Sequence, residues 1–84
     1  SLQNQAAAER ASGDLERSAA TLERAIRIAP DDAALWLELG EVRLAQGRPD
    51  LAEGMAMRAA ALSGDDDALR RRAESLASRA RRSR

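Results

Sequence analysis

The chain has 84 residues, of which 44% are hydrophobic and 33% are charged, and this is the composition of one small globular domain. Fourteen arginines balance fourteen acidic residues, and there is no lysine, histidine, cysteine, tyrosine or phenylalanine. This inventory excludes disulfides, thiol nucleophiles, imidazole acid–base catalysis, Schiff-base lysines and Cys/His metal sites. We therefore expect a protein that is not an enzyme and that uses no cofactor, metal or small-molecule substrate.

The predicted secondary structure is entirely helical. Alanine, leucine, arginine and glutamate dominate the chain, and apolar residues recur at three- and four-residue spacing, as on one face of an α-helix. Glycine and proline fall between the periodic segments, where helices begin or end. In chain order the predicted helices cover residues 2–12, 15–29, 32–46, 49–62 and 67–82.

The last predicted helix separates its charges along its length. Asp65, Asp66 and Asp67 come first and are expected to cap the helix and to pair with arginines four residues later, rather than to bind a metal. Seven arginines follow, and the last ones, from Arg81 onward, are expected to fray. We interpret this helix as a cap whose arginines face an acidic body. Binding of nucleic acid or an anionic membrane is an alternative, but the helix lacks the aromatic or large aliphatic side chains that such binding uses.

An internal repeat is the strongest signal in the sequence. Several residues recur 34 positions later, including Gly13 as Gly47, Ala25 as Ala59 and Asp32 as Asp66. The segment Trp36-x-x-Leu39-Gly40, followed by Gly47 and by small residues at 52 and 59, resembles a tetratricopeptide repeat. The segment from Gly13 through Leu22 and Ala25 to Pro30 resembles the second half of a preceding one.

This resemblance implies a single domain over residues 1–84, with repeat units at about 4–32 and 33–66 and a terminal helix at 67–82. The implied fold is all-α, with about five helices in antiparallel helix-turn-helix repeats stacked as a short right-handed α-solenoid. Bulky, small and turn residues in these repeats position one helix against the next. The residues assigned to this packing are Gly13, Leu22, Ala25, Pro30, Trp36, Leu39, Gly40, Gly47, Ala52 and Ala59.

The resemblance further implies a non-catalytic protein-interaction scaffold that holds a partner's peptide or helix in a concave groove. The helix at 32–46 fits this role because it is apolar on two opposed sides, with Leu35, Leu39 and Val42 on one side and Leu37 and Leu44 on the other. The residues that correspond to the family's groove are Gln3, Ala7, Arg10, Leu37, Glu41, Leu44, Arg71, Ser75 and Ser78.

Two other interpretations remain open at the level of sequence. Leu37 and Leu44 could be covered by the terminal helix, or they could form an interface with a second copy of the chain in a homodimer. Because the chain begins at Ser1 and holds only about two and a half repeats, we also expect it to be a piece of a longer repeat protein. The arginine- and alanine-rich composition suggests a bacterial protein, located in the cytoplasm or on the periplasmic side of the cell envelope, and not integral to the membrane.

Overall fold

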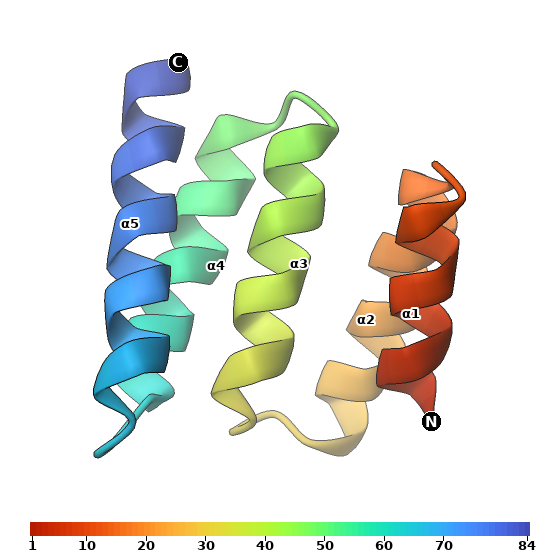
Figure 1. The fold of residues 1–84 in the computed structure, drawn as a ribbon, viewed down its shortest axis with the longest axis horizontal. Helices are drawn as coiled ribbons and strands as arrows, with labels where there is room; N and C mark the ends of the chain where they lie inside the picture. The colour runs from red at the N-terminus through yellow and green to blue at the C-terminus, as the bar shows by residue number, and fades with distance from the viewer.

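The computed structural model describes all 84 residues and contains five α-helices and no strand. The helices are α1 (Leu2–Ala11), α2 (Leu15–Ile28), α3 (Ala33–Ala45), α4 (Pro49–Leu62) and α5 (Asp67–Ser83). The all-α prediction is confirmed, and every predicted boundary lies within about a residue of the observed one. Consecutive helices run in opposite directions, so that α1, α3 and α5 are parallel to one another (Figure 1).

The helix ends follow from local side-chain and backbone chemistry. Aspartate carboxylates cap three helices by accepting backbone N–H groups: Asp14 from Arg17, Asp32 from Ala34 and Asp66 from Leu69, at 3.0–3.1 Å. Gly13 and Gly47 adopt φ values of +86° and +77°, which lets the chain leave α1 and α3 through tight turns.

The aspartate cluster before α5 acts as predicted in part. Asp66 caps the helix, but the expected ion pairs at four-residue spacing do not form. Instead Arg70 pairs with Asp67 and donates a hydrogen bond to the carbonyl of Gly64 at 2.9 Å. Arg70 therefore closes the turn between α4 and α5 instead of facing the body of the protein.

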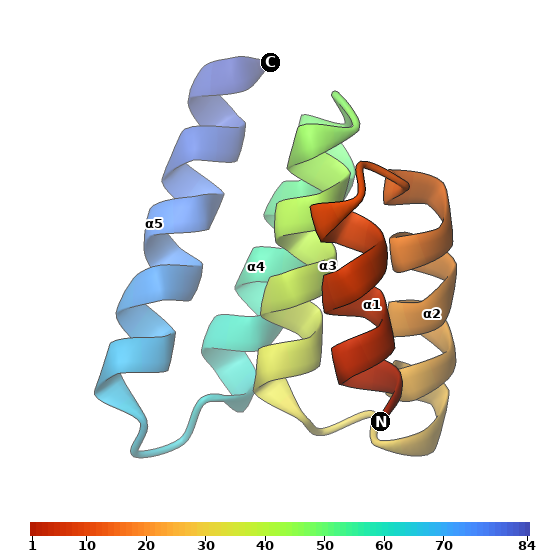
Figure 2. The same ribbon diagram turned by 45° about the vertical axis from the view of Figure 1, so that its right-hand side comes forward.

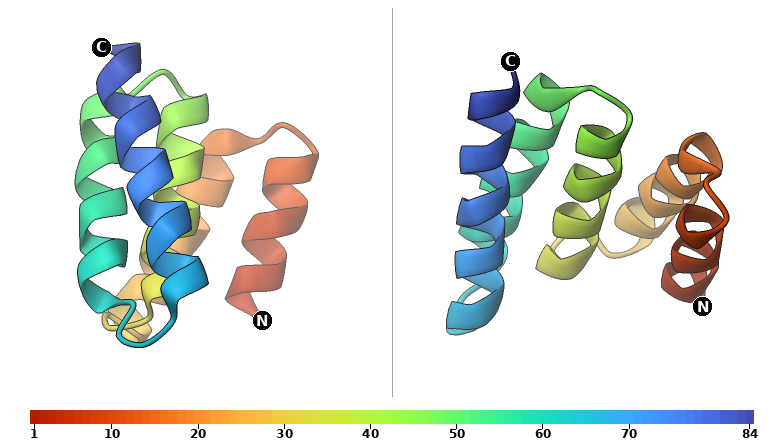
Figure 3. Two further views of the ribbon diagram at one scale, coloured as in Figure 1. Left: turned by 60° about the vertical axis from the view of Figure 1, so that its left-hand side comes forward. Right: turned by 45° about the horizontal axis from the view of Figure 1, so that its top comes forward.

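Helix α3 lies at the centre of the molecule. It separates the α1–α2 hairpin on one side from α4 and α5 on the other (Figures 1 and 2). Helix α3 packs against α2, α4 and α5, but its backbone does not pack closely against that of α1. Two further views show the same separation of α1 from α3 (Figure 3).

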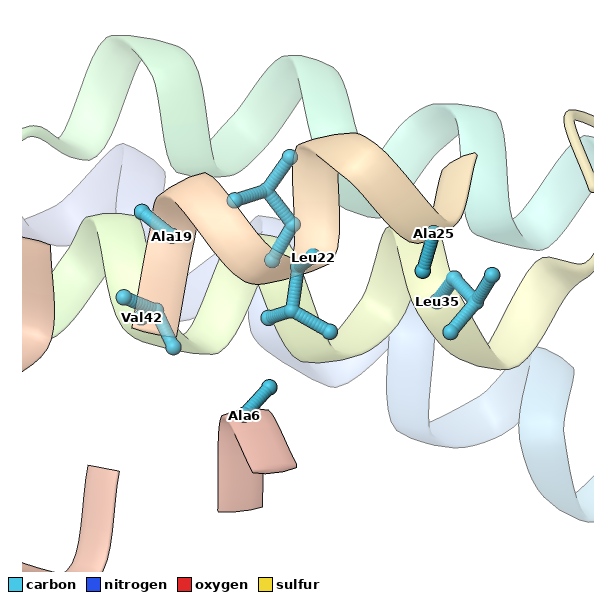
Figure 4. Close-up of a cluster of buried hydrophobic side chains, with 7 residues drawn as sticks. Ala6, Ala19, Leu22, Ala25, Leu35 and Val42 are labelled. Atoms are coloured by element: carbon cyan, nitrogen blue, oxygen red, sulfur yellow. The ribbon is translucent and has the colours of Figure 1, made fainter. Parts of the chain in front are cut away.

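Two groups of buried side chains form the core, one on each side of α3. The N-terminal cluster joins α1, α2 and α3, with Leu22 of α2 lying between Ala6 of α1 and Leu35 and Val42 of α3 (Figure 4). A buried hydrogen bond supplements it, because the Ser18 hydroxyl donates to the carbonyl of Ala6 at 2.8 Å. The N-terminal hairpin is thus held partly by polar contacts across α1 and α2.

The C-terminal cluster joins α3, α4 and α5 and is built mainly from alanine. Its larger members are Leu37 of α3 and Leu76 of α5, which are 1% and 0% exposed. Gly40 allows close approach here, since a Cβ at this position would lie only 2.9 Å from Leu76 Cδ2 and 3.3 Å from the carbonyl oxygen of Ala52. Small residues therefore bring α4 and α5 tightly onto α3.

The C-terminal end of α5 is anchored, which corrects the expectation that it frays. The helix continues to Ser83, and its last turns pair with acids at the start of α4. Arg81 lies 3.1 Å from Glu53, and Arg84 lies 3.0 Å from Glu53 and 3.3 Å from Asp50. The interpretation of α5 as a cap that directs arginines toward acids of the body agrees with these contacts.

Candidate protein-binding groove

Helices α1, α3 and α5 share one face of the molecule, which we call the groove face (Figures 1 and 2). Two main hollows open on this face, one between α1 and α3 and one between α3 and α5. We call them the N-terminal pocket and the arginine pocket. A smaller hollow of about 240 Å³ lies between them, where Leu44 and Leu76 meet Arg10, Glu41 and Arg79.

The N-terminal pocket has a volume of about 580 Å³ and an apolar floor with polar groups at its edge. Its volume falls in the range of about 300–1,000 Å³ that is typical of ligand-binding clefts. Alanines of α1 together with Leu22 and Val42 form the apolar part, and Gln3, Arg10 and Glu38 provide the polar groups. The pocket exists because α1 contacts α3 through long side chains rather than through closely packed backbones.

Glu38 is the one acid that lines this pocket. Burial raises the pKa of its carboxyl, and the charges of Glu41 and Asp32 act in the same direction. The Gln3 side chain opposes this shift by donating a hydrogen bond to Glu38 at 2.5 Å, and Arg72 opposes it by its charge. Glu38 therefore has a single amide partner, and no arginine lies within ion-pair distance of it.

The arginine pocket has a volume of about 430 Å³ and almost no apolar lining. Its walls are Glu41 of α3 and Ala68, Arg71, Arg72, Ser75 and Arg79 of α5. Three guanidinium groups therefore surround one carboxylate. Arg72 lies 3.8 Å from Glu41, whereas Arg71 and Arg79 have no acidic partner within 4 Å.

Glu41 connects the two pockets. Its carboxylate accepts a hydrogen bond from Arg10 of α1 at 3.3 Å and lies 3.8 Å from Arg72 of α5. One acid of α3 thus links both outer helices of the groove face, and it stands at the centre of the groove as the sequence predicts. All three side chains retain exposure, so this bridge is accessible from solvent.

Most of the predicted groove residues lie on the groove face. Leu37 does not, because α5 covers it within the C-terminal cluster, which is the alternative that the sequence left open. Ser78 also lies elsewhere, in a shallow hollow between α4 and α5, where it accepts a hydrogen bond from Arg81. The residues that do line the hollows of this face are Gln3, Ala7, Arg10, Glu41, Leu44, Arg71 and Ser75.

Sequence reasoning missed several residues of the groove face. In α5, adding 34 to the α3 positions selects Arg71, Ser75 and Ser78, whereas the arginine pocket is lined by Arg71 and Ser75 together with Ala68, Arg72 and Arg79. Ala68, Arg72, Ser75 and Arg79 follow four- and three-residue spacing and could have been found as one helical face. Glu38 and Val42 were missed because their pocket depends on how far α1 stands from α3.

The residues assigned to repeat packing lie at half-buried, turn and buried positions. Trp36 is half-buried against the C-terminal cluster, its indole N–H donates to the carbonyl of Pro30 at 2.8 Å, and Arg58 lies 5.6 Å from the centre of its ring. Gly13 and Gly47 form turns. The buried members are Leu22, Ala25, Leu39, Gly40, Ala52 and Ala59.

The structure contains no group of three or more acidic side chains arranged to hold a metal ion. None of the five helices is both long enough and apolar enough to cross a bilayer.

Comparison with known proteins agrees with the repeat and the fold. The tetratricopeptide repeat family model matches residues 9–78, and the chain therefore belongs to this family. Among solved structures it is similar to the globular C-terminal domain of P. aeruginosa LpoP, with 38% sequence identity and a TM-score of 0.95. That match covers 98% of this chain and 77% of the LpoP chain. No curated protein matches the sequence.

Proposed function

We propose that this domain is a non-catalytic protein-interaction module that binds a peptide or helix of a partner protein on its groove face. The observation that carries this proposal is the N-terminal pocket, an open hollow of about 580 Å³ with an apolar floor and polar edges. Such a surface suits an apolar anchor side chain from a partner, with hydrogen bonds at the rim to fix its orientation. Membership of the tetratricopeptide repeat family supports the same proposal.

Self-association through Leu37 and Leu44 is the competing function. Leu37 is 1% exposed and is not accessible to a second copy, whereas Leu44 is partly exposed in the smaller hollow of the groove face. The large hydrophobic residues that remain exposed are Ile28 on α2 and Leu51 and Met57 on α4. They lie outside the three helices of the groove face, so self-association through them would leave the groove free for a partner.

Photo-crosslinking in cells of the organism that produces this protein tests this proposal. Ala7 lines the N-terminal pocket and is exposed, whereas Ala20 of α2 and Ala61 of α4 are exposed alanines outside the groove face. A photoreactive amino acid at position 7 should form a defined protein crosslink, and the same group at positions 20 and 61 should not.

A substitution at the same position gives an independent measurement. Ala7→Arg places a long charged side chain at the mouth of the pocket and should weaken binding of the crosslinked partner by at least about tenfold, while Ala20→Arg should leave it unchanged. Equal crosslinking at all three positions, or equal effects of both substitutions, would rule out the groove as the binding surface.

A further inference from the structure

The arginine pocket has more positive charge than the acidic residues of this chain neutralise. Arg70, Arg81 and Arg84 on the same helix are paired with acids of this chain. Arg71 and Arg79, by contrast, project into the pocket with no acidic partner. Arg71 and Arg79 are therefore pocket arginines that no acid of this chain neutralises, whereas Arg82, which also makes no ion pair, lies outside the pocket lining.

The one carboxylate of the pocket is already shared. Glu41 accepts a hydrogen bond from Arg10 and also faces Arg72 at 3.8 Å, so it cannot neutralise the three guanidinium groups around the hollow. The Ser75 hydroxyl lies in the same lining and can donate one more hydrogen bond. Planar guanidinium groups bind carboxylates through paired N–H donors, which makes such a set suited to acidic side chains.

We propose that the arginine pocket binds an acidic segment, rich in aspartate or glutamate, of the partner protein. This inference rests on the proposed function and specifies its ligand: the partner places an apolar side chain in the N-terminal pocket and its acidic residues against α5. Glu41 then acts as an internal competitor that holds Arg72 until a partner carboxylate replaces it.

The charge pattern favours an acidic peptide over nucleic acid. A nucleic acid backbone presents continuous negative charge, and Glu38 and Glu41 on α3 would repel it where it crossed the groove. Stacking is also not available, because Trp36, the only aromatic residue, is held by Pro30 and Arg58 away from the lining of both pockets. A short acidic peptide can bind against α5 without crossing the acids of α3, and it does not depend on aromatic stacking.

A peptide titration tests the proposal without knowledge of the partner. The probe is a hexaglutamate peptide blocked at both ends, added to the ¹⁵N-labelled domain at low salt, with hexaglutamine as the uncharged control. Amide shifts should change around residues 68–79 and Glu41 with hexaglutamate and not with hexaglutamine. Binding should weaken as salt is added, because exposed charge pairs are screened.

Two double variants test whether hexaglutamate binds in the arginine pocket. Arg71→Ala with Arg79→Ala should weaken hexaglutamate binding about tenfold, since two exposed charge-assisted pairs are lost. Arg24→Ala with Arg27→Ala removes two exposed arginines of α2 that make no ion pair, and it should change binding less than about twofold. Glu41→Gln should tighten binding, because the competing carboxylate is removed. Circular dichroism checks that each variant is folded.

Several outcomes would overturn the proposal. Equal losses in the two double variants would show attraction to net charge only, and tighter binding of a twelve-nucleotide thymidine strand or of anionic vesicles through Arg71 and Arg79 would assign the pocket to those ligands instead. The result is separable from the proposed function. A crosslink at position 7 whose yield is unchanged by Arg71→Ala with Arg79→Ala would leave the groove as the interaction surface and reject the acidic segment.

Discussion

The molecule contains two groups of three helices that share α3, and the helices of the two groups pack together to different degrees. In the C-terminal group, α5 packs on both α3 and α4, and it buries Leu37. In the N-terminal group, α1 packs on α2 but stands away from α3, and the N-terminal pocket opens between them. The position in α1 that lies 34 residues before Leu37 is Gln3. With an apolar side chain at this repeat position, the next helix, α5, packs against α3. With a polar side chain at the same position of α1, α1 and α3 stay apart.

The two hairpins also use different contacts to hold their helices together. In the α3–α4 hairpin Gly40 and Ala52 meet at close range without a polar side chain. The corresponding residues of the α1–α2 hairpin, 34 positions earlier, are Ala6 and Ser18, and there the serine hydroxyl bonds to the alanine carbonyl. Small apolar residues thus stabilise the closed group, and hydrogen bonds contribute to the open one.

The largest expected effect is at Leu37. Leu37→Ala removes a fully buried side chain from the C-terminal cluster and should lower the free energy of unfolding by about 2–5 kcal/mol, which urea denaturation can measure. Gln3→Ala at the matched position of α1 should cost less than about 1 kcal/mol, because it removes one partly exposed hydrogen bond. Similar losses for both variants would show that the two groups are equally closed.

Substitutions at two glycines test the close packing of the helices with a smaller expected change in stability. Gly40→Ala should destabilise the protein by about 1–3 kcal/mol, because the new Cβ would lie 2.9 Å from Leu76 Cδ2 and 3.2 Å from Met55 Cβ. Gly54→Ala on the exposed side of α4 meets no atom within 4 Å and should stabilise the helix by about 0.5–1 kcal/mol. Thermal unfolding of both variants would check this, and stabilisation by Gly40→Ala would contradict the interpretation.

The smallest expected effect is a pH dependence in the open group. Burial raises the pKa of Glu38 in the folded protein, so the folded state holds this proton more tightly than the unfolded state does. The associated stability is present below the ordinary pKa of 4.5 and is lost as pH rises through the raised value. Glu38→Gln should therefore gain stability relative to the native protein between about pH 4 and pH 7.

Urea denaturation of both proteins across this range measures the difference, which we expect to be a fraction of a kilocalorie per mole because the group is only half-buried. A difference between Glu38→Gln and the native protein that stays constant with pH would remove the electrostatic explanation.

Much of the fold could be predicted because its signals are local. Asp14, Asp32 and Asp66 cap helices through their own neighbours in the chain, and Gly13 and Gly47 form turns that require positive φ. The 34-residue period then placed the helices in register and indicated the family. The groove could be predicted only in part, since each of its residues depends on how two helices meet.

Leu37 is a residue whose position, in the groove or in the core, the sequence could not decide. Its place in the repeat indicated a groove residue, and its apolar character was equally compatible with burial. Only the packing of Leu76 and Ala73 of α5 against α3 decided that it lies in the core. The ion pairs of the C-terminal arginines also depend on tertiary structure, because Arg81 and Arg84 pair with acids of α4 that lie about thirty residues earlier in the chain.

The sequence by itself determined the helices, their ends, the repeat and the absence of thiol, imidazole and lysine amine groups, because these depend on residue type and on spacing within a few turns. The tertiary structure decided which face stays open. It did so through contacts between helices: Leu37 draws α5 onto α3, while Gln3 and Arg10 hold α1 at the length of their side chains. Distances between elements are set by packing that no short stretch of sequence encodes.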